Sequence, residues 1–188
     1  MFKKTLIYNL LLAFGLLSSG LKAQEASELE TRIGSVIHRI TQGELPRITE
    51  DFLLAGLTLD PKFDRRFTNF SGDQEGRYLS AFAPVDPAQQ TIDIHHFVSA
   101  VIANQKADGR FGADSLSFET GQIDGPQMAL LWGNGRLLTG LLDYYNQYPD
   151  RKEALQSAIR LADFLSGITT ACTQPEVAQV PQEMIALA

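Results

Sequence analysis

Apolar residues in this chain recur at the spacing of an α-helix, and no stretch alternates apolar and polar residues as a half-buried strand would. The first clear case runs from Ser27 to Gln42, where one helix face is apolar and Gly43 is expected to end the helix. The apolar positions of that face are Leu29, Ile33, Val36, Ile37 and Ile40. The pattern predicts an all-α fold.

The same pattern predicts further helices. One is expected over 45–57, with Pro46 tolerated near its start, and a short one begins at Gly76. Asp86-Pro87 has the form of an N-cap followed by proline at the first helical position, so we expect a helix from there to about Gln105. Its predicted buried residues are Ile94, Phe97, Val98, Val101 and Ile102.

Two longer helices are expected in the C-terminal half. Pro126 begins the first, which reaches about Tyr145. Asp150 caps the second, Glu153 takes the capping-box position, and Gly167 is expected to end it. Its predicted apolar stripe is Leu155, Ala158, Ile159, Ala162 and Leu165. Residues 168–188 contain two prolines and a weak pattern, so we expect a weakly structured tail.

Two heptapeptides of similar composition lie 59 residues apart: GRYLSAF, which starts at Gly76, and GRLLTGL, which starts at Gly135. This interval suits a hairpin of two helices stacked beside its neighbour. The alternative interpretation is two unrelated helices that happen to begin alike. Irregular segments over 58–75 and 106–125 precede the two heptapeptides, and loops of this length in a compact domain favour a functional role.

The N-terminal segment has the features of a secretory signal peptide. Lys3 and Lys4 precede an apolar run that is too short to span a bilayer, and a plausible cleavage site follows Ala23. We therefore expect a signal peptide over 1–23 and one domain over 24–188, exported to the bacterial periplasm or out of the cell. An uncleaved N-terminal anchor is the alternative. After cleavage we expect no membrane association.

The charge balance restricts the classes of partner. The chain carries a net charge of −6, and removal of residues 1–23 takes away three lysines and no acidic residue, which leaves −9. Such a chain is not expected to bind nucleic acid or anionic membranes, because both require a basic surface. The balance suits neutral ligands. The lone cysteine, Cys172, cannot form an internal disulfide.

Two segments carry a resemblance to a known family. IANQKADGRFG, over 102–112, resembles the end of a helix and the following loop in (α/α)6-barrel glycoside hydrolases. Together with ALLWGNGRLLTGLLDYYNQYPDRKEALQSAIRLADFL, it is similar to the N-terminal part of the β-L-arabinofuranosidase-like group, glycoside hydrolase family 127 and its relatives. The resemblance covers roughly residues 70–166. It implies helical hairpins arranged as a toroid, with a sugar site in the loops at one end.

The chain departs from that family in its chemistry. The family's cysteine nucleophile and its Cys and Glu zinc ligands have no counterpart, since Cys172 has no second thiol near it. The family's Gly-His appears here as Gly135-Arg136. We expect no metal or cofactor. Five or six helices make only part of a toroid, so the chain is expected to be inactive alone and to self-associate through unpaired helix faces.

Eight residues are candidates for contact with a sugar: Arg77, Asp108, Arg110, Asp124, Gln127, Trp132, Asn134 and Arg136. Arg77 and Arg136 either donate fork hydrogen bonds to sugar hydroxyls or pair with a nearby aspartate. Trp132 either stacks on a sugar or packs in the core. Asn134, between two glycines, suggests a turn or a kinked helix.

Glycoside hydrolysis needs two carboxyl groups that face one sugar. Acidic candidates in the two irregular segments are Asp73, Glu75, Asp108, Asp114, Glu119 and Asp124, and the sequence assigns no catalytic pair among them. The leading hypothesis is a secreted fragment of a glycoside hydrolase that acts on arabinofuranosyl-like plant glycans. The alternatives are a helical-repeat module that binds glycan or protein, and a truncated product without a function of its own.

Overall fold

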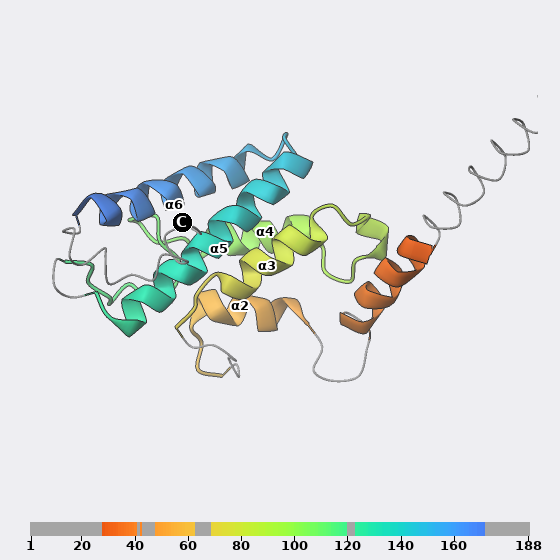
Figure 1. The fold of residues 1–188 in the computed structure, drawn as a ribbon, viewed down its shortest axis with the longest axis horizontal. Coiled ribbons are helices and arrows are strands. Elements are labelled where there is room, and N and C mark those ends of the chain that lie inside the picture. Colours follow the sequence, from red (N-terminus) through yellow and green to blue (C-terminus); the bar gives the residue numbers. More distant parts are fainter. Residues whose placement is uncertain (1–27, 41, 43–47, 63–68, 120–122, 172–188) are drawn as a thin grey trace, which may run out of the picture. The chain divides into compact units, whose positions relative to one another are not determined.

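The computed structural model describes residues 28–40, 42, 48–62, 69–119 and 123–171 (Figure 1). These residues form helices and irregular segments and contain no strand, which confirms the predicted all-α class. The chain divides into two compact units, Met1–Arg47 and Ile48–Ala188. The expected signal peptide and Cys172 lie outside the described residues.

The first unit contains one described helix, over 28–40, at the predicted place. Three residues of its predicted apolar face, Leu29, Ile33 and Val36, are exposed, whereas Ile37 is buried. On the polar side Arg32 Nη2 donates to Glu28 Oε1 at 2.6 Å, an ion pair one turn apart.

The second unit arranges its helices in two rows (Figure 1). Its elements are α2 (Glu50–Thr58), α3 (Asp73–Phe82), the 3-10 turn η1 (Pro87–Gln89), α4 (Ile94–Ala103), α5 (Gly125–Gln147) and α6 (Lys152–Ala171). Helices α3 and α5 form one row, and α2, α4 and α6 follow one another in the second. The rows meet where α3 packs on α2 and α4, and where α5 packs on α6. Closure of these rows into a toroid remains a prediction.

The core lies between the rows and is built from leucine and aromatic side chains. The largest fully buried side chains include Leu79, Phe97, Phe111, Leu137, Leu141, Tyr144 and Leu161. Tyr78 stacks on Phe82 with ring centroids 4.4 Å apart and meets Phe97 edge-on at 5.3 Å. These contacts fasten α3 to α4. Burial of such side chains is the main stabilising term of a domain of this size.

Helix α2 begins later than the sequence predicts. Thr49 takes the N-cap position in extended conformation, and its hydroxyl accepts a hydrogen bond from Phe52 N at 3.2 Å. The helix therefore starts at Glu50 rather than near residue 45. Pro46 lies outside the described residues. Leu59 ends the helix in left-handed conformation, with φ 55°.

Asp86-Pro87 opens only the 3-10 turn η1, so the predicted helix start at this point is wrong. Gln90 is extended, and its side-chain amide donates to Phe82 O at 3.0 Å and Val85 O at 2.7 Å. It thus ties the turn to the end of α3. The helix starts after Asp93, whose carboxylate accepts hydrogen bonds from two backbone N–H groups of the next turn. Ile102, predicted as buried, is half-buried.

Helix α6 buries a face that coincides with the predicted one only in part, and it passes through Gly167 to Ala171. Ala158 and Leu165 are buried as predicted. Ile159 is 45% exposed and Leu155 is half-buried. The buried face is Ala154, Ser157, Ala158, Leu161, Leu165 and Ile168. The predicted tail is therefore helical over 168–171, and 172–188 lie outside the described residues.

Candidate functional site

The two similar heptapeptides lie on α3 and α5, which pack against each other at glycine residues. A Cβ atom on Gly72 would lie 2.6 Å from Gly133 O, and one on Gly140 would lie 2.6 Å from Gly76 O. A Cβ atom on Gly76 would overlap Arg136 O. Side chains are thus excluded from the contact, and the backbones of α3 and α5 approach each other directly, as in small-residue helix interfaces.

These contacts also give the direction of the two helices. Gly72 faces Gly133 and Gly76 faces Gly140, so residue numbers rise together and α3 runs parallel to α5. Equivalent helices of successive hairpins are expected to be parallel in a repeat array. The arrangement therefore favours the hairpin interpretation of the 59-residue interval over two unrelated helix starts.

Three polar side chains meet beside this contact. Arg77 Nε lies 3.0 Å from both carboxylate oxygens of Asp73, and Trp132 Nε1 donates to Asp73 Oδ1 at 3.2 Å. The Asp73 side chain is 11% exposed, whereas that of Arg77 is 56% exposed. Asp73 and Trp132 are 59 residues apart, the interval of the repeat. One carboxylate thus joins an arginine of its own helix to the only tryptophan of the chain.

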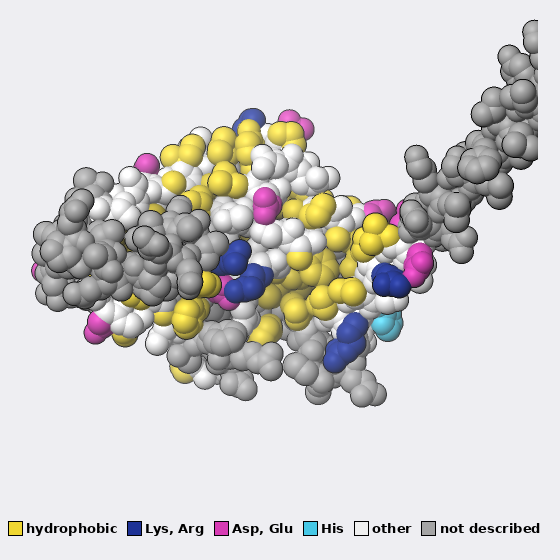
Figure 2. Space-filling model, viewed as in Figure 1, with side chains coloured by type: hydrophobic (Ala, Val, Ile, Leu, Met, Phe, Trp, Pro, Cys, Tyr) yellow, Lys and Arg dark blue, Asp and Glu magenta, His cyan; other side chains and the backbone are white. Residues whose placement is uncertain are grey.

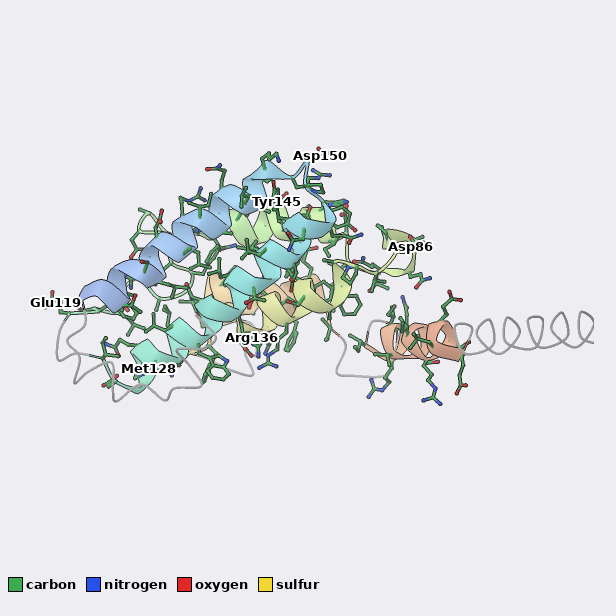
Figure 3. The ribbon with its side chains drawn as sticks, turned by 45° about the horizontal axis from the view of Figure 1, so that its top comes forward. Asp86, Glu119, Met128, Arg136, Tyr145 and Asp150 are labelled. Carbon is green, nitrogen blue, oxygen red and sulfur yellow. The ribbon has the colours of Figure 1, made fainter. Side chains whose placement is uncertain are left out.

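Arg136 extends the group along α5. It follows Trp132 by one helical turn and therefore lies on the same side of the helix. Figure 3 places Arg136 on α5 next to α3. The residue is half-buried, and its Nε is buried without a hydrogen-bond partner. We call Asp73, Arg77, Trp132 and Arg136 the α3–α5 cluster. Figure 2 shows basic and acidic side chains gathered where these two helices lie.

Asn134 has a structural role in the interior. Its Oδ1 accepts from Phe111 N at 2.9 Å, and its Nδ2 donates to Ser71 O and Phe111 O, both at 3.1 Å. The side chain is fully buried in the middle of α5, and no turn or left-handed conformation occurs there. It joins both irregular segments to α5. Of the two alternatives for Asn134, a turn or a kinked helix, the turn does not occur.

We expect Asn134→Ala to lower the free energy of unfolding by about 2 kcal/mol, because three buried backbone groups lose their partner and water restores only part of the bonding. Urea denaturation followed by circular dichroism measures this. Asn104→Ala is the matched control, since Asn104 Nδ2 bonds only Ala100 O within its own helix end, and should cost under about 1 kcal/mol. Equal costs for the two variants would contradict the bridging role.

Asp108 and Arg110 are engaged with their own segment. Arg110 Nε donates to Asp108 Oδ2 at 2.5 Å, and its Nη1 donates to Leu116 O at 2.7 Å. The guanidinium lies 5.0 Å from the ring centroids of both Phe118 and Phe164. Only 13% of the Arg110 side chain is exposed. These contacts fold the segment onto α6 and leave little of Arg110 for a ligand.

Asp124 and Gln127 lie at the start of α5, where the two irregular segments meet. Asp124 is exposed at the N-cap position and makes no side-chain cap hydrogen bond. Gln127 Nε2 donates to Ser117 O at 3.1 Å, while Gln127 Oε1 is buried without a partner. A pocket of about 200 Å³ lies nearby, and its walls are mostly apolar. It is lined by Leu59, Asn69, Ser71, Ala113, Leu116, Pro126 and Leu130.

Asp73 and Glu75 were predicted to lie in an irregular segment, but both lie in the first turn of α3, and their environments differ. Glu75 is 1% exposed, its Oε1 has no partner, and it packs against Gly56 of α2. Burial raises the pKa of Glu75 to about 8, although the backbone N–H groups of Glu75 and Gly72 act in the opposite direction. Asp73 contacts α5 and Glu75 contacts α2, so they do not face one sugar. The i,i+4 spacing to Arg77 was the available signal for Asp73.

The two adjacent histidines contact different helices. His95 Nδ1 lies 2.7 Å from Tyr144 Oη on α5, and His96 Nδ1 lies 2.9 Å from Glu50 Oε1 on α2. Burial raises the pKa of Tyr144 to about 12. Within the described residues, no three His, Cys, Asp or Glu side chains are grouped as metal ligands would be.

Comparisons with protein-family models, curated proteins and solved structures find no match. The described residues therefore define a fold class and not a protein family. Their regular secondary structure is entirely helical, and the second unit packs its helices in two rows with a glycine contact between α3 and α5. No helix within 28–40, 48–62, 69–119 or 123–171 has the length and hydrophobicity needed to cross a membrane.

Proposed function

We propose that this chain is an exported, glycan-binding part of an all-α carbohydrate-active protein, and that the glycan lies on the α3–α5 cluster. The observation that carries the proposal is the contact of both Arg77 and Trp132 with Asp73. Arg136 follows Trp132 by one helical turn on α5, and its Nε is buried without a partner. Arg77, Trp132 and Arg136 are three of the eight sequence candidates. Aromatic rings that stack on sugar faces, flanked by forked donors for hydroxyl groups, are suited to carbohydrates.

The proposal assigns binding rather than hydrolysis to the chain alone. Asp73 accepts hydrogen bonds from Arg77 and Trp132, and Glu75 is directed toward α2. Neither arrangement offers the two facing carboxyl groups that glycosidases use. The glycan class, arabinofuranosyl-like, rests on the family resemblance of residues 70–166 and stays part of the proposal.

Isothermal titration calorimetry with an arabinofuranosyl oligosaccharide tests this function. We expect binding that weakens roughly tenfold in Arg77→Gln and in Trp132→Ala, because each loses a direct ligand contact. Arg151→Gln is the matched control, since Arg151 lies in the turn between α5 and α6 and is 46% exposed. Equal binding by all four proteins, or release of arabinose by the wild-type chain, would contradict the proposal.

A further inference from the structure

The α3–α5 cluster offers many more hydrogen-bond donors than acceptors. An arginine carries five N–H donors, and Arg77 uses only its Nε, on Asp73. Arg136 Nε is buried without a partner, and no ion pair joins Arg136 to an acidic side chain of the described residues. The one carboxylate, Asp73, already accepts from Arg77 and Trp132. What remains for a ligand is a set of charged donors.

The charge of the α3–α5 cluster agrees with its excess of hydrogen-bond donors. Two arginines and one aspartate give the cluster a charge of about +1, on a chain whose net charge is −6. The net charge by itself favours neutral ligands, so the cluster departs locally from the balance of the whole chain. A basic site on an acidic protein selects its ligand at short range, because the field of the whole chain repels anions.

A carboxylate would use this set of donors more fully than the hydroxyl groups of a neutral sugar. Each sugar hydroxyl both donates and accepts, and the cluster has few acceptors left for hydroxyl hydrogens. A carboxylate only accepts, and its two oxygens match the fork of a guanidinium. From the donor excess we infer that the α3–α5 cluster prefers glycans that contain a uronic acid, whose carboxylate binds Arg136 and Arg77 beside the Trp132 ring.

This inference rests on the proposed glycan-binding function, and a matched pair of ligands separates the two. The probes are a trigalacturonic acid and the same trisaccharide after reduction of its carboxyl groups to alcohols, with sodium acetate as the free carboxylate. We expect the acidic trisaccharide to bind at least roughly tenfold more tightly than the reduced one in calorimetry at moderate salt.

Variants then locate the carboxylate. Arg136→Gln should abolish the preference for the acidic trisaccharide, and Arg136→Lys should keep only part of it, because lysine retains the charge but loses the fork. Arg151→Gln should keep the full preference. Arg77→Gln provides a second test if Arg136→Gln fails to fold, which its thermal melting curve would show.

Four results would overturn the proposed preference for acidic glycans. Equal binding of the acidic and reduced trisaccharides would overturn the acidic class while leaving glycan binding in place. Failure of both trisaccharides to bind, with the arabinofuranosyl oligosaccharide still bound, would do the same. Binding of acetate as tight as that of the acidic trisaccharide would show a simple anion site and overturn the inference. A preference that persists in Arg136→Gln and in Arg77→Gln would place the acidic glycan elsewhere and overturn it as well.

Discussion

Raising the pH from 6 to 9 is expected to lower the free energy of unfolding of this chain by about 3 kcal/mol through one residue, Glu75. Its carboxyl is buried on α3 against Gly56 of α2, and burial raises its pKa from the usual 4.5 to about 8. The folded chain therefore keeps a proton that the unfolded chain releases. The contribution of Glu75 to stability is greatest at a pH below its pKa in the unfolded chain. It is lost as the pH rises through its pKa in the folded chain.

The neutral variant Glu75→Gln isolates this effect, because it keeps the shape of the protonated side chain and cannot ionise. Urea unfolding at pH 6 and at pH 9 should show a large difference for the wild-type chain and a much smaller one for Glu75→Gln. Glu153→Gln is the control, since the Glu153 side chain is 49% exposed, and it should follow the wild type. If Glu75→Gln lost stability with pH as steeply as the wild type, the buried proton would not be its cause.

Replacement of Gly76 by alanine is expected to cost about 3 kcal/mol of unfolding free energy, the upper part of the range for overpacked interiors. The added Cβ atom would overlap Arg136 O, which is a backbone atom, and the Cβ position is itself fixed by the backbone of α3. No side chain can rotate away, so α3 and α5 must separate. Their separation would also part Trp132 from Asp73 and weaken the cluster.

Gly167→Ala is the matched control for this substitution. Gly167 lies within α6 and a Cβ atom there would meet nothing within 4 Å. Alanine should stabilise that helix by up to about 1 kcal/mol, because it is the better helix former. Thermal melting of both variants measures the contrast. A Gly76→Ala protein that melts at the wild-type temperature would show that the two helices do not approach as closely as their backbones indicate.

The approximate positions of the helices were predicted correctly, because helical periodicity and capping act within a few residues. The start of α4 and the buried face of α6 were predicted less well, because contacts with other parts of the fold determine them. Asp86-Pro87 is a good N-cap sequence, yet Gln90 bonds the end of α3 and delays the helix until Asp93. On α6 the apolar residues are compatible with more than one buried face, and burial in the fold selects the face that carries Ala154, Leu161 and Ile168. Gly167 does not end α6, which continues to Ala171.

In the candidate site, too, some contacts could be predicted from the sequence and others depend on the fold. Arg77 and Asp73 are one turn apart on one helix, so their ion pair could be predicted from spacing. The bond from Trp132 to Asp73 spans 59 residues and depends on the glycine contact between α3 and α5. Asn134 lies between two glycines in the sequence, but its three backbone hydrogen bonds reach segments that only the fold brings together.

The amino-acid sequence by itself determined the all-α class, the approximate positions of the helices and the repeated Gly-Arg phrase, because helical periodicity and capping act over a few residues. Tertiary structure alone decided which glycine faces which carbonyl, that Glu75 keeps its proton, and that Asp73 joins Arg77 to Trp132. Those properties arise from burial and from contacts between residues far apart in the chain, and neither is encoded in local spacing.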